Sequence, residues 1–347
     1  MRRRKRVLAR AMAGVRSQIV VGVDAGGTKT EAMACGRDGR LLGFARAGRG
    51  NWETIGLEAA GQAYSEAVEG CLRFAGVQRQ DVSASAFALA GLDWASDRVR
   101  LETVIAGLGL DGPQTVVNDA FGALRAGSRR ANAIISIAGT GTVTAGRNAA
   151  GEVLRTLGVA CGERGGGANL VQAALDAVAD QLHRGEPPGA MARLLCREKQ
   201  VGSAEELFEY VSRKVSNRKH LATLAPVVGA AASAGDATAV GVLRSTGRRL
   251  ARTTTIVARR LGIADTGFDV VCAGSVHRAG GELARTFDKS VLRRCPGASV
   301  RRLRAPPVVG AVLLALDTLG SVSDDVTERL MDQGMRAARG GAEDTGR

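Results

Sequence analysis

The segment QIVVGVDAGGTKT, residues 18–30, decides the fold. Its apolar run ends in Asp24 and continues into Ala-Gly-Gly-Thr, a pattern typical of a buried strand that leads into a glycine turn. Residues 30–35 then predict a second strand, the Asp-Gly pair within 36–39 predicts a hairpin, and residues 40–45 predict a third strand. The chain therefore begins with strand, Gly/Thr turn, strand, hairpin and strand.

The second half of the sequence starts in the same way. Residues 133–138 (AIISIA) predict a strand, Gly139-Thr-Gly-Thr142 a tight turn, and 143–147 a second strand. A hairpin loop at 148–151 leads into a third strand at 152–157. We interpret this recurrence as a structural duplication, although the two copies share little sequence identity.

Helices and further strands alternate through the rest of both halves. In the first half we expect a helix over 57–75, a strand over 84–90, a helix over 95–108 and a strand over 115–118. In the second half we expect helices over 168–182, 203–215 and 220–262 (broken at 233–236), a strand over 268–273 and a helix over 306–319. This order predicts an α/β protein with a helical insertion in its second half.

The two Gly/Thr turns indicate phosphate binding. Glycine permits positive φ and a close approach of the backbone to a ligand, and the turned N–H groups and Thr hydroxyls can converge on an anion. One such turn is a weak signal, whereas two at equivalent positions of a duplicated fold predict a nucleotide held from both sides. Neither turn is a P-loop, and no Gly-x-Gly-x-x-Gly follows the first strand. Lys29 lies at the end of the first turn, and its side chain either contacts phosphate or is exposed to solvent.

Two aspartates at strand ends are the candidate metal ligand and catalytic base. Asp24 is well placed to hold Mg²⁺ against phosphate oxygens, the alternative being a turn-capping role. Asp119 closes an apolar strand and opens the apolar helix 120–126, so it can accept a proton from a substrate hydroxyl. The alternative for Asp119 is a helix N-cap. The neighbouring Asn118 is a candidate hydrogen-bond partner for another hydroxyl.

Composition limits the other classes of function. The chain has 347 residues and a net charge of +14, but seven of its basic residues lie in the acid-free segment 1–16. Only six of the 48 basic residues are Lys, so an Arg-rich background accounts for much of the charge. The basic tail is no signal peptide, because no apolar run follows it, and we expect no membrane span. Six scattered Cys without a Cys-x-x-Cys pair argue against a zinc or iron–sulfur site and fit the cytoplasm.

At these residues the chain resembles a known family. Val23–Thr30 resembles the first phosphate motif of the actin/sugar-kinase/Hsp70 superfamily, and the chain as a whole resembles the BadF/BadG/BcrA/BcrD ATPase family with its N-acetylglucosamine kinase members. The likeness spans roughly residues 18–320. The further matching pieces are, in order, Gly50-Asn51, Leu89–Asp93, Asn118-Asp119, Gly139–Thr142, Gly235–Ala239 and Cys272–Ser275.

The resemblance implies an α/β fold of two ribonuclease H-like (actin-like ATPase) domains around an interdomain ATP cleft. The expected divisions are a basic tail at 1–16, an N-terminal domain at 17–125 joined by a C-terminal helix at 306–320, a C-terminal domain at 126–305 with the helical insertion, and a polar tail at 324–347. We expect that polar tail to fray.

The resemblance also implies an ATP-dependent amino-sugar kinase that phosphorylates the 6-hydroxyl of N-acetylglucosamine, with Asp119 as the base and Asp24 near Mg²⁺. The residues expected at ATP are Gly26, Gly27, Thr28, Lys29, Thr30, Gly139, Thr140, Gly141 and Thr142, with Gly274 and Ser275 near the adenosine. The residues expected at the sugar are Asn51, Trp52, Asp93, Asn118 and Glu163, since the aromatic Trp52 can stack on a sugar ring.

Two departures from the family pattern leave alternatives open. Family members usually carry Gly-Asp-Glu-Gly-Ser where this chain has Gly-Glu163-Arg164-Gly-Gly, and Gly-Gly where it has Gly274-Ser275. Glucosamine or another hexose as substrate, or a nucleotide-binding regulator with little or no kinase activity, are the alternatives. A nucleic-acid or membrane-surface protein that uses the basic tail ranks last, so we expect neither partner. A homodimer stays open.

Overall fold

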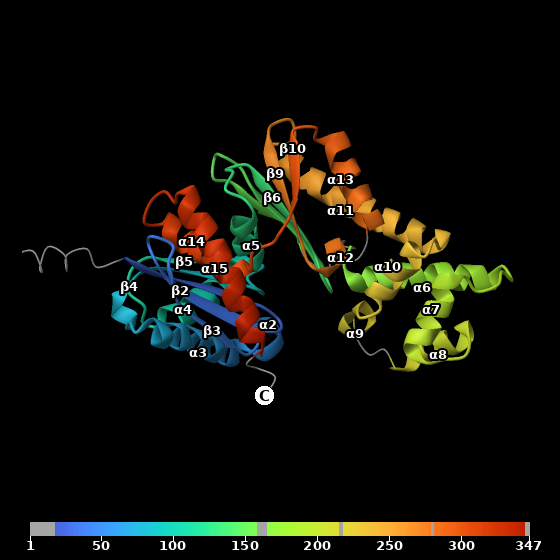
Figure 1. The fold of residues 1–347 in the computed structure, drawn as a ribbon, viewed down its shortest axis with the longest axis horizontal. Helices are drawn as coiled ribbons and strands as arrows, with labels where there is room; N and C mark the ends of the chain where they lie inside the picture. The colour runs from blue at the N-terminus through green and yellow to red at the C-terminus, as the bar shows by residue number, and fades with distance from the viewer. Residues whose placement is uncertain (1–17, 158–164, 215–217, 279–280, 344–347) are drawn as a thin grey trace, which may run out of the picture. The chain divides into compact units, whose positions relative to one another are not determined.

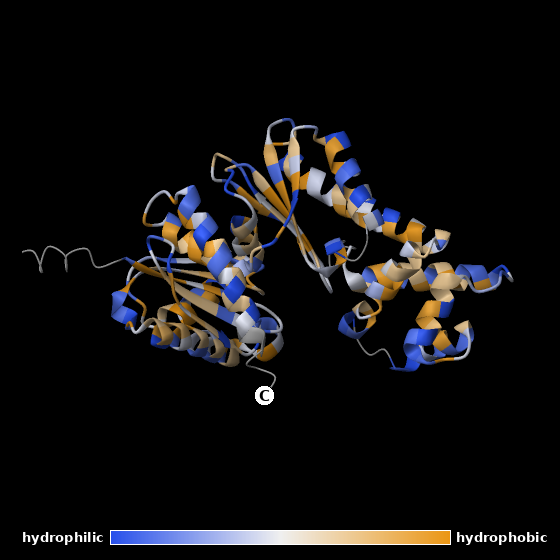
Figure 2. Ribbon diagram, viewed as in Figure 1, coloured by the Kyte–Doolittle hydropathy of each residue, from blue (hydrophilic) through white to orange (hydrophobic). Residues whose placement is uncertain are grey.

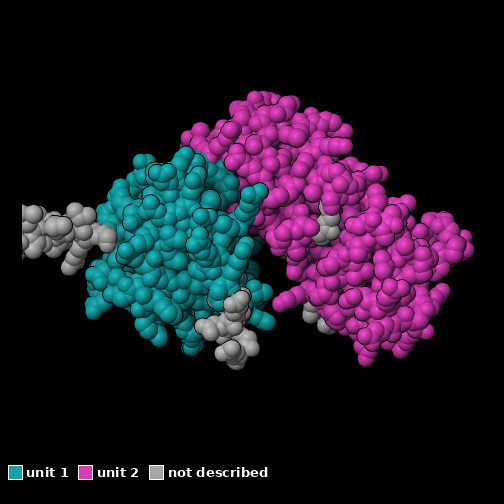
Figure 3. Space-filling view, viewed as in Figure 1, with its two compact units in different colours: residues 1–129, 304–347 teal, residues 130–303 magenta. Residues whose placement is uncertain are grey.

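The computed structural model describes residues 18–157, 165–214, 218–278 and 281–343. The chain divides into two compact units, one made of residues 1–129 and 304–347 (unit 1) and the other of residues 130–303 (unit 2) (Figure 3). Each unit holds one five-stranded sheet with helices packed on it (Figure 1). The expectation of an α/β chain built from two similar halves is confirmed.

The sheet of unit 1 has the strand order β3-β2-β1-β4-β5. The strands are β1 (Ile19–Ala25), β2 (Thr30–Gly36), β3 (Leu41–Ala47), β4 (Val82–Leu89) and β5 (Gln114–Asn118). β1, β2 and β3 are antiparallel neighbours, whereas β1, β4 and β5 run parallel. Ala25 pairs with Leu89, and Leu89 with Asn118, so the carboxyl ends of three strands meet at one edge.

Helices cover both faces of this sheet. The alternate residues Val21, Val23 and Ala25 of β1 are buried in a core with α3 (Leu57–Ala75) and α4 (Ala95–Ala106). Because successive strand residues point to opposite faces, Gly22 faces the other side, where α14 (Pro307–Asp317) lies. Two shorter helices, α2 (Trp52–Ile55) and α5 (Asp119–Gly127), follow loops at the carboxyl edge.

Helix α14 packs against unit 1 backbone to backbone. A Cβ added to Gly22 of β1 would lie 2.2 Å from the Val312 nitrogen, and one added to Gly310 would lie 1.8 Å from the Gly122 oxygen of α5. A side chain at either position is therefore incompatible with the observed packing. Glycine at these positions lets a helix from the far end of the chain touch both β1 and α5.

An ion pair reinforces the same contact. The Arg125 guanidinium of α5 donates two hydrogen bonds to the Asp317 carboxylate at the end of α14, at 2.7 and 2.9 Å. Arg125 is buried and Asp317 is partly exposed. A two-pronged pair of this kind fixes direction as well as distance, so it sets how α14 lies along α5.

The C-terminal segment differs from the sequence expectation. Residues 324–343 form the regular helix α15 (Asp324–Glu343), where the sequence analysis expects a frayed polar end. Thr327, Leu330 and Gly334 are buried at helical spacing, and the Leu41 backbone N–H of β3 donates to Gln333 at 2.8 Å. This buried stripe contains only one large apolar residue, which explains why hydropathy did not reveal it. The helix covers the edge strand β3.

The sheet of unit 2 repeats the topology of unit 1 in the order β10-β9-β6-β7-β8. The strands are β6 (Ala133–Ala138), β7 (Thr142–Arg147), β8 (Val153–Arg155), β9 (Phe268–Ala273) and β10 (Ala298–Arg302). β6, β7 and β8 are antiparallel neighbours, and β6, β9 and β10 run parallel. The turn between β6 and β7 thus corresponds to the turn between β1 and β2.

Unit 2 carries more helices than the sequence analysis expects. They are α6 (Gly167–His183), α7 (Ala190–Lys199), α8 (Ala204–Lys214), α9 (Arg218–Ala222), α10 (Ala225–Ser233), α11 (Ala237–Arg260), α12 (Ser275–Arg278) and α13 (Gly281–Arg294). The sequence analysis does not predict α7, α13 or strand β10, because charged residues dilute their apolar pattern. Hydrophobic and hydrophilic residues alternate along the helices of both units (Figure 2).

Within the described ranges, no single helix is long and apolar enough to cross a membrane. The pair 218–233 and 237–260 meets the length and composition criteria only when taken together, and it is bent by 119° at its break.

The packing of α14 generates a stability prediction. We expect Gly310→Ala to lower the unfolding free energy by about 1–3 kcal/mol, because the added methyl group forces α14 and α5 apart. Thermal unfolding of the purified chain measures this change. Gly241→Ala in α11 is the matched control, since a Cβ there meets nothing within 4 Å and alanine favours a helix. A Gly310→Ala variant as stable as the parent would contradict the packing described above.

Candidate functional site

The carboxyl edge of the unit 1 sheet gathers several polar residues. Asp24 lies next to the end of β1, Asn118 ends β5, and Asp119 is the first residue of α5. Because β1, β4 and β5 are parallel, their ends and the loops that follow share one edge. Edges of this kind are where open α/β sheets place their ligands.

The start of α5 separates the roles of Asn118 and Asp119. The Asn118 side-chain oxygen accepts a hydrogen bond from the Ala120 N–H at 3.0 Å, so Asn118 is the N-cap. Its side-chain nitrogen donates to Asp93 at 3.0 Å and to the Leu92 carbonyl at 3.3 Å. Asn118 therefore joins α5 to the loop after β4 and holds the Asp93 carboxylate. Asp119 does not have the N-cap role that the sequence left open for it.

Asp24 lies in the field of two other carboxylates. Burial, followed by the charges of Asp119 and Glu31, raises the pKa of Asp24 to about 8, and Lys29 acts in the opposite direction. The shift shows that negative charge at this position is poorly compensated by the protein. No group of three or more His, Cys, Asp or Glu side chains among the described residues forms a metal site by itself.

Glu31 is a buried acid that the sequence analysis did not single out. Its Oε1 atom accepts hydrogen bonds from Lys29 Nζ and from Arg46 Nη2, both at 2.6 Å, and its Oε2 atom is buried with no hydrogen-bond partner in the described part of the chain. Arg46 Nη2 also donates to the Ala338 carbonyl of α15 at 3.2 Å. The sequence signal that could have identified Glu31 is an acidic residue within a strand. All its neighbours in β2 are buried.

The turn between β1 and β2 is tight and exposed. The Gly26 N–H donates to the Lys29 carbonyl at 2.9 Å, and Gly27, Thr28 and Lys29 are exposed. Thr30 is buried, and its hydroxyl has no partner among the described residues. Gly26 and Gly27 do not have positive φ, so the conformational reason that the sequence analysis gives for these glycines is wrong. A Cβ at Gly27 would meet nothing within 4 Å, so packing does not require glycine there either.

The predicted sugar residues Asn51 and Trp52 meet the loop after β4. Asn51 is the N-cap of α2, and the Trp52 indole N–H donates to the Gly91 carbonyl at 2.7 Å. Gly91 has φ of 83°, and a Cβ there would lie 2.8 Å from the Asn51 side-chain oxygen. The Arg100 guanidinium lies over the Trp52 ring at 5.5 Å. The structure thus brings Asn51 and Trp52 together with residues 91–93, and Trp52 anchors that loop.

In unit 2, the second Gly/Thr turn packs tightly against two other segments, the start of α6 and Gly274-Ser275. The Gly167 N–H at the start of α6 donates to the Gly139 carbonyl at 2.7 Å. Gly274 has φ of 93°, and a Cβ there would lie 2.2 Å from the Ala138 oxygen. The Thr142 hydroxyl is buried without a hydrogen-bond partner in the described ranges. Residues 139–142, the start of α6 and Gly274-Ser275 therefore lie together, as the nucleotide prediction requires within this unit.

A buried histidine, His277, holds the segment Gly274-Ser275 in place. His277 in α12 makes a 3.0 Å hydrogen bond through Nε2 with the Ser136 hydroxyl of β6. Burial, together with the nearby Arg302 charge, lowers the pKa of His277 to about 3, so its ring is neutral at physiological pH. His277 ties Gly274-Ser275 to the strand that leads into the turn, which is a positioning role.

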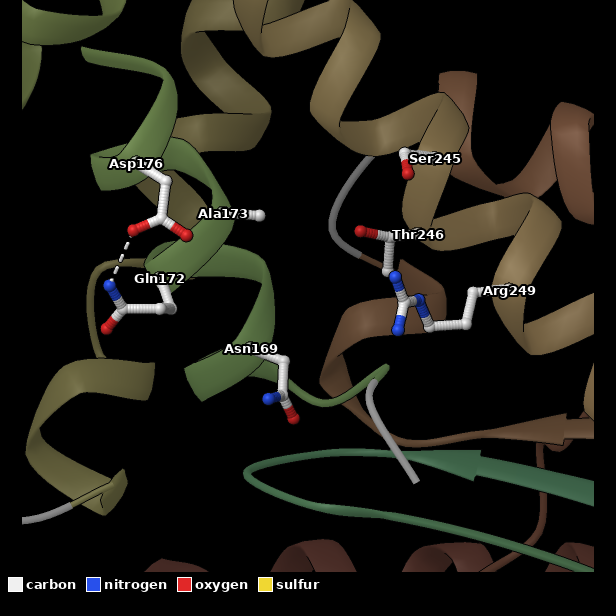
Figure 4. A pocket seen from close by; sticks show the side chains of 7 residues that line it. All are labelled: Asn169, Gln172, Ala173, Asp176, Ser245, Thr246 and Arg249. Carbon is white, nitrogen blue, oxygen red and sulfur yellow. Dashed lines mark hydrogen bonds between the residues drawn. The ribbon is translucent and has the colours of Figure 1, made fainter. Parts of the chain in front are cut away.

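A pocket lies beside these turns, between α6 and α11. Its volume is about 180 Å³, and Figure 4 shows the side chains that line it: Asn169, Gln172, Ala173 and Asp176 from α6, and Ser245, Thr246 and Arg249 from α11. The two residues before Asn169 contact the 139–142 turn, since the Gly167 and Ala168 N–H groups donate to the Gly139 and Thr140 carbonyls at 2.7 and 3.5 Å. The Asn169 end of the pocket therefore lies close to that turn. The sequence analysis named none of its lining residues.

Glu163, which the sequence analysis places at the sugar, lies outside the described residues, as does the adjacent Arg164.

The raised pKa of Asp24 predicts how stability depends on pH. A carboxyl group whose folded pKa is about 8 and whose unfolded pKa is near 3.8 makes the folded state less stable as pH rises through that interval. Asp24→Asn cannot ionise, so we expect it to be more stable than the parent at pH 9, by about 1–3 kcal/mol or several degrees in Tm, and similar to it near pH 4.

Thermal unfolding at pH 4, 6.5 and 9 in the presence of a chelator measures this difference. Asp111→Asn, a change at an exposed aspartate of the same unit, controls for the loss of one negative charge. Parallel pH profiles for the parent and Asp24→Asn would show that the Asp24 carboxyl has no unusual pKa.

Comparison with known proteins shows the relationships of the chain. The model of the BadF/BadG/BcrA/BcrD ATPase family matches residues 21–315. An N-acetylmuramic acid/N-acetylglucosamine kinase from Clostridium acetobutylicum is 28% identical over 299 residues, which cover 85% of this chain and 97% of the relative. An N-acetyl-D-glucosamine kinase from Dictyostelium discoideum is 24% identical over 314 residues, or 87% of this chain and 98% of the relative.

Solved structures show the same fold. The crystal structure of a putative N-acetylglucosamine kinase from Chromobacterium violaceum has a TM-score of 0.63 at 21% identity and covers 86% of this chain and 99% of its own. The fold is that of the actin-like ATPases, as the resemblance of the sequence implies. With a family model matched over most of its length, the chain belongs to the BadF/BadG/BcrA/BcrD ATPase family.

Proposed function

We propose that the protein is an ATP-dependent amino-sugar kinase that transfers the γ-phosphate of ATP to the 6-hydroxyl of N-acetylglucosamine. The coarser function, an ATP-dependent sugar kinase, agrees with the family description and with the names of the relatives. One observation carries the proposal: two units of the same topology each present a Gly/Thr turn at the same place, and unit 1 adds carboxylates at the edge beside its turn.

Asp119 is the proposed catalytic base. Phosphoryl transfer to an alcohol needs a group that orients the hydroxyl and accepts its proton, together with neutralisation of the phosphate charge. Asp119 is the first residue of α5, and its charge acts on Asp24 near the end of β1. Because Asn118 caps the helix, the Asp119 carboxylate is not needed for that role.

Mg²⁺ fits the residues present at the end of β1. This ion prefers oxygen ligands, takes only one or two carboxylates from a protein, and keeps water and phosphate oxygens as its other ligands. Asp24 would hold it, directly or through water, and the ion would neutralise phosphate charge. The raised pKa of Asp24 indicates a lack of positive charge that a divalent cation would supply, and the buried Glu31 Oε2 has no hydrogen-bond partner among the described residues.

The two turns are proposed to hold the phosphates of ATP. In unit 1 these are Gly26–Thr30, and in unit 2 they are Gly139–Thr142, whose buried Thr142 hydroxyl has no partner in the described part. Gly274 and Ser275 lie beside the second turn, and one end of the pocket between α6 and α11 lies close to it. We therefore place the nucleoside in that pocket, where amide, hydroxyl and carboxylate groups can select a base and ribose.

The proposed sugar residues are Asn51, Trp52, Asp93 and Glu163. Of the described members, Asn51 and Trp52 adjoin the loop that ends at Asp93, and Asn118 holds the Asp93 carboxylate. A second substrate candidate is N-acetylmuramic acid, which the name of the Clostridium relative includes. Arg164 favours it, because this residue puts a cation where the family usually has an acid, and the lactyl group of that sugar carries a carboxylate.

A panel of sugars tests the proposal. We expect Mg²⁺-dependent ADP release with N-acetylglucosamine or N-acetylmuramic acid and little with glucose. Asp119→Asn should lower kcat by about 10²–10⁴-fold, because the amide cannot accept the proton. Asp111→Asn is the matched control and should retain the activity of the parent. An Asp119→Asn enzyme as active as the parent, or turnover that no sugar stimulates, would rule out this mechanism.

The glycines of the two turns offer a second test. Neither Gly27 nor Gly139 has positive φ, and a Cβ at either position meets no other protein atom within 4 Å. We expect Gly27→Ala and Gly139→Ala to leave Tm within a few degrees of the parent but to raise KM for ATP about 10-fold or more, because the methyl group would occupy phosphate space. Gly241→Ala, also in open space but in α11, controls for the substitution itself. An unchanged KM for ATP in both turn variants would count against phosphate binding there.

A further inference from the structure

Helices α11 and α13 form an arginine-lined pocket that the proposed kinase reaction does not use as a whole. Its volume is about 510 Å³. The lining residues are Ser245, Arg248, Arg249, Arg252, Thr253 and Ile256 from α11 and Arg294 from α13. Four guanidinium groups and two hydroxyls thus line one concave surface, and none of the described residues that line it is acidic.

The positive charge of this pocket is not compensated by the protein. The guanidinium groups of Arg248, Arg249 and Arg252 have no hydrogen bond or ion pair within the described residues, and that of Arg294 donates one bond to the Ser290 carbonyl at 3.0 Å. Like charges held this close repel one another unless an anion lies between them. The pocket therefore has the electrostatic character of an anion site.

Several other arginines of the same region are paired. Arg244 of α11 and Arg285 of α13 share Glu282, at 2.6 and 2.7 Å. Arg302 of the neighbouring strand β10 pairs with Asp288 of α13 at 2.8 Å. Arg259 and Arg260 of α11 also have no side-chain partner among the described residues, but they are exposed and do not line the pocket, so the arginines of the pocket are distinguished by lining one hollow surface together.

The spacing along α11 suits a ligand with several anionic groups. Ser245, Arg249, Arg252 and Ile256 recur every three or four residues and so share one face of the helix. The two arginines of this row lie three residues apart, which is about 4.5 Å along the helix axis at about 1.5 Å per residue. The forked guanidinium group matches the oxygens of a phosphate, and two such groups about one turn apart match successive phosphates better than a single one.

We propose that this pocket binds a small anion with two or more phosphate groups in a chain, such as an inorganic polyphosphate or the phosphates of a nucleotide. It shares Ser245 and Arg249 with the pocket between α6 and α11, so the ligand would lie next to the proposed nucleoside site. The inference does not need the chain to be a kinase, because it depends only on the charges and shape of unit 2.

Calorimetric titration of the full-length chain with tripolyphosphate, and separately with ATP, at about 0.15 M salt tests the proposal. We expect the double variant Arg248→Ala/Arg252→Ala to weaken binding at least 10-fold. The matched control is Arg259→Ala/Arg260→Ala, which removes two exposed arginines of the same helix that do not line the pocket, and it should change affinity less than 2-fold. A selective loss for tripolyphosphate identifies an inorganic chain as the ligand, and a selective loss for ATP identifies a nucleotide.

Three results would overturn the proposal. The first is unchanged affinity for both ligands in the Arg248→Ala/Arg252→Ala variant, and the second is an equal loss in the control variant, which would mean unspecific charge attraction. The third is binding of a DNA duplex, lost in the same double variant, without binding of either small ligand. A chain that binds tripolyphosphate but phosphorylates no sugar would leave this proposal standing while refuting the proposed kinase function.

Discussion

Helix α14 can occupy its place in unit 1 only because Gly22 and Gly310 have no side chains. Its backbone lies directly against β1 and against α5, and the Arg125–Asp317 ion pair fixes its direction. β1 carries Asp24, and α5 begins with Asp119. The packing of α14 against both elements therefore fixes the positions of the two proposed functional carboxylates. Since α14 follows the whole of unit 2 in the sequence, unit 1 is completed only when both ends of its chain have come together.

The carboxyl edge of unit 1 combines stabilising and destabilising electrostatics. Glu31 is buried, but Lys29 and Arg46 hydrogen-bond to one of its oxygens, and Arg46 is itself held by the Ala338 carbonyl of α15. For Asp24 the charge of Lys29 offsets only part of the effect of burial and of the two neighbouring carboxylates, and its pKa rises accordingly. Groups with strongly shifted pKa values are concentrated at functional sites, where residues needed for activity often lower the stability of the fold. Helix α15, which lies beyond the residues matched by the family model, thus supports the side of the edge that the proposed phosphates would approach.

Much of the fold could be predicted from the sequence because its central strands are uninterrupted apolar runs bounded by glycine turns. The recurrence of the 18–30 pattern at 133–142 predicts the duplication, and the matching strand orders of the two sheets support it. Helices α13 and α15 were missed because few of their residues are buried and large. The contact of Gly310 with Gly122 could not be predicted either, since glycine leaves no hydropathic signal and the partners are far apart in sequence.

The structure tests one of the two reasons that the sequence analysis gives for the turn glycines. Positive φ is wrong for Gly27 and Gly139, and no described residue fills the space of a Cβ at either position. The other reason, a close approach of the backbone to a ligand, stays a prediction, because contacts within the protein cannot test it. The sequence does not distinguish the roles of the arginines. Arg46 pairs with the buried Glu31, and Arg125 is itself buried and pairs with Asp317, whereas Arg248 and Arg252 line a hollow surface, and composition counts them alike. Only the pairing of each guanidinium group separates a cation that holds the fold together from one available to a ligand.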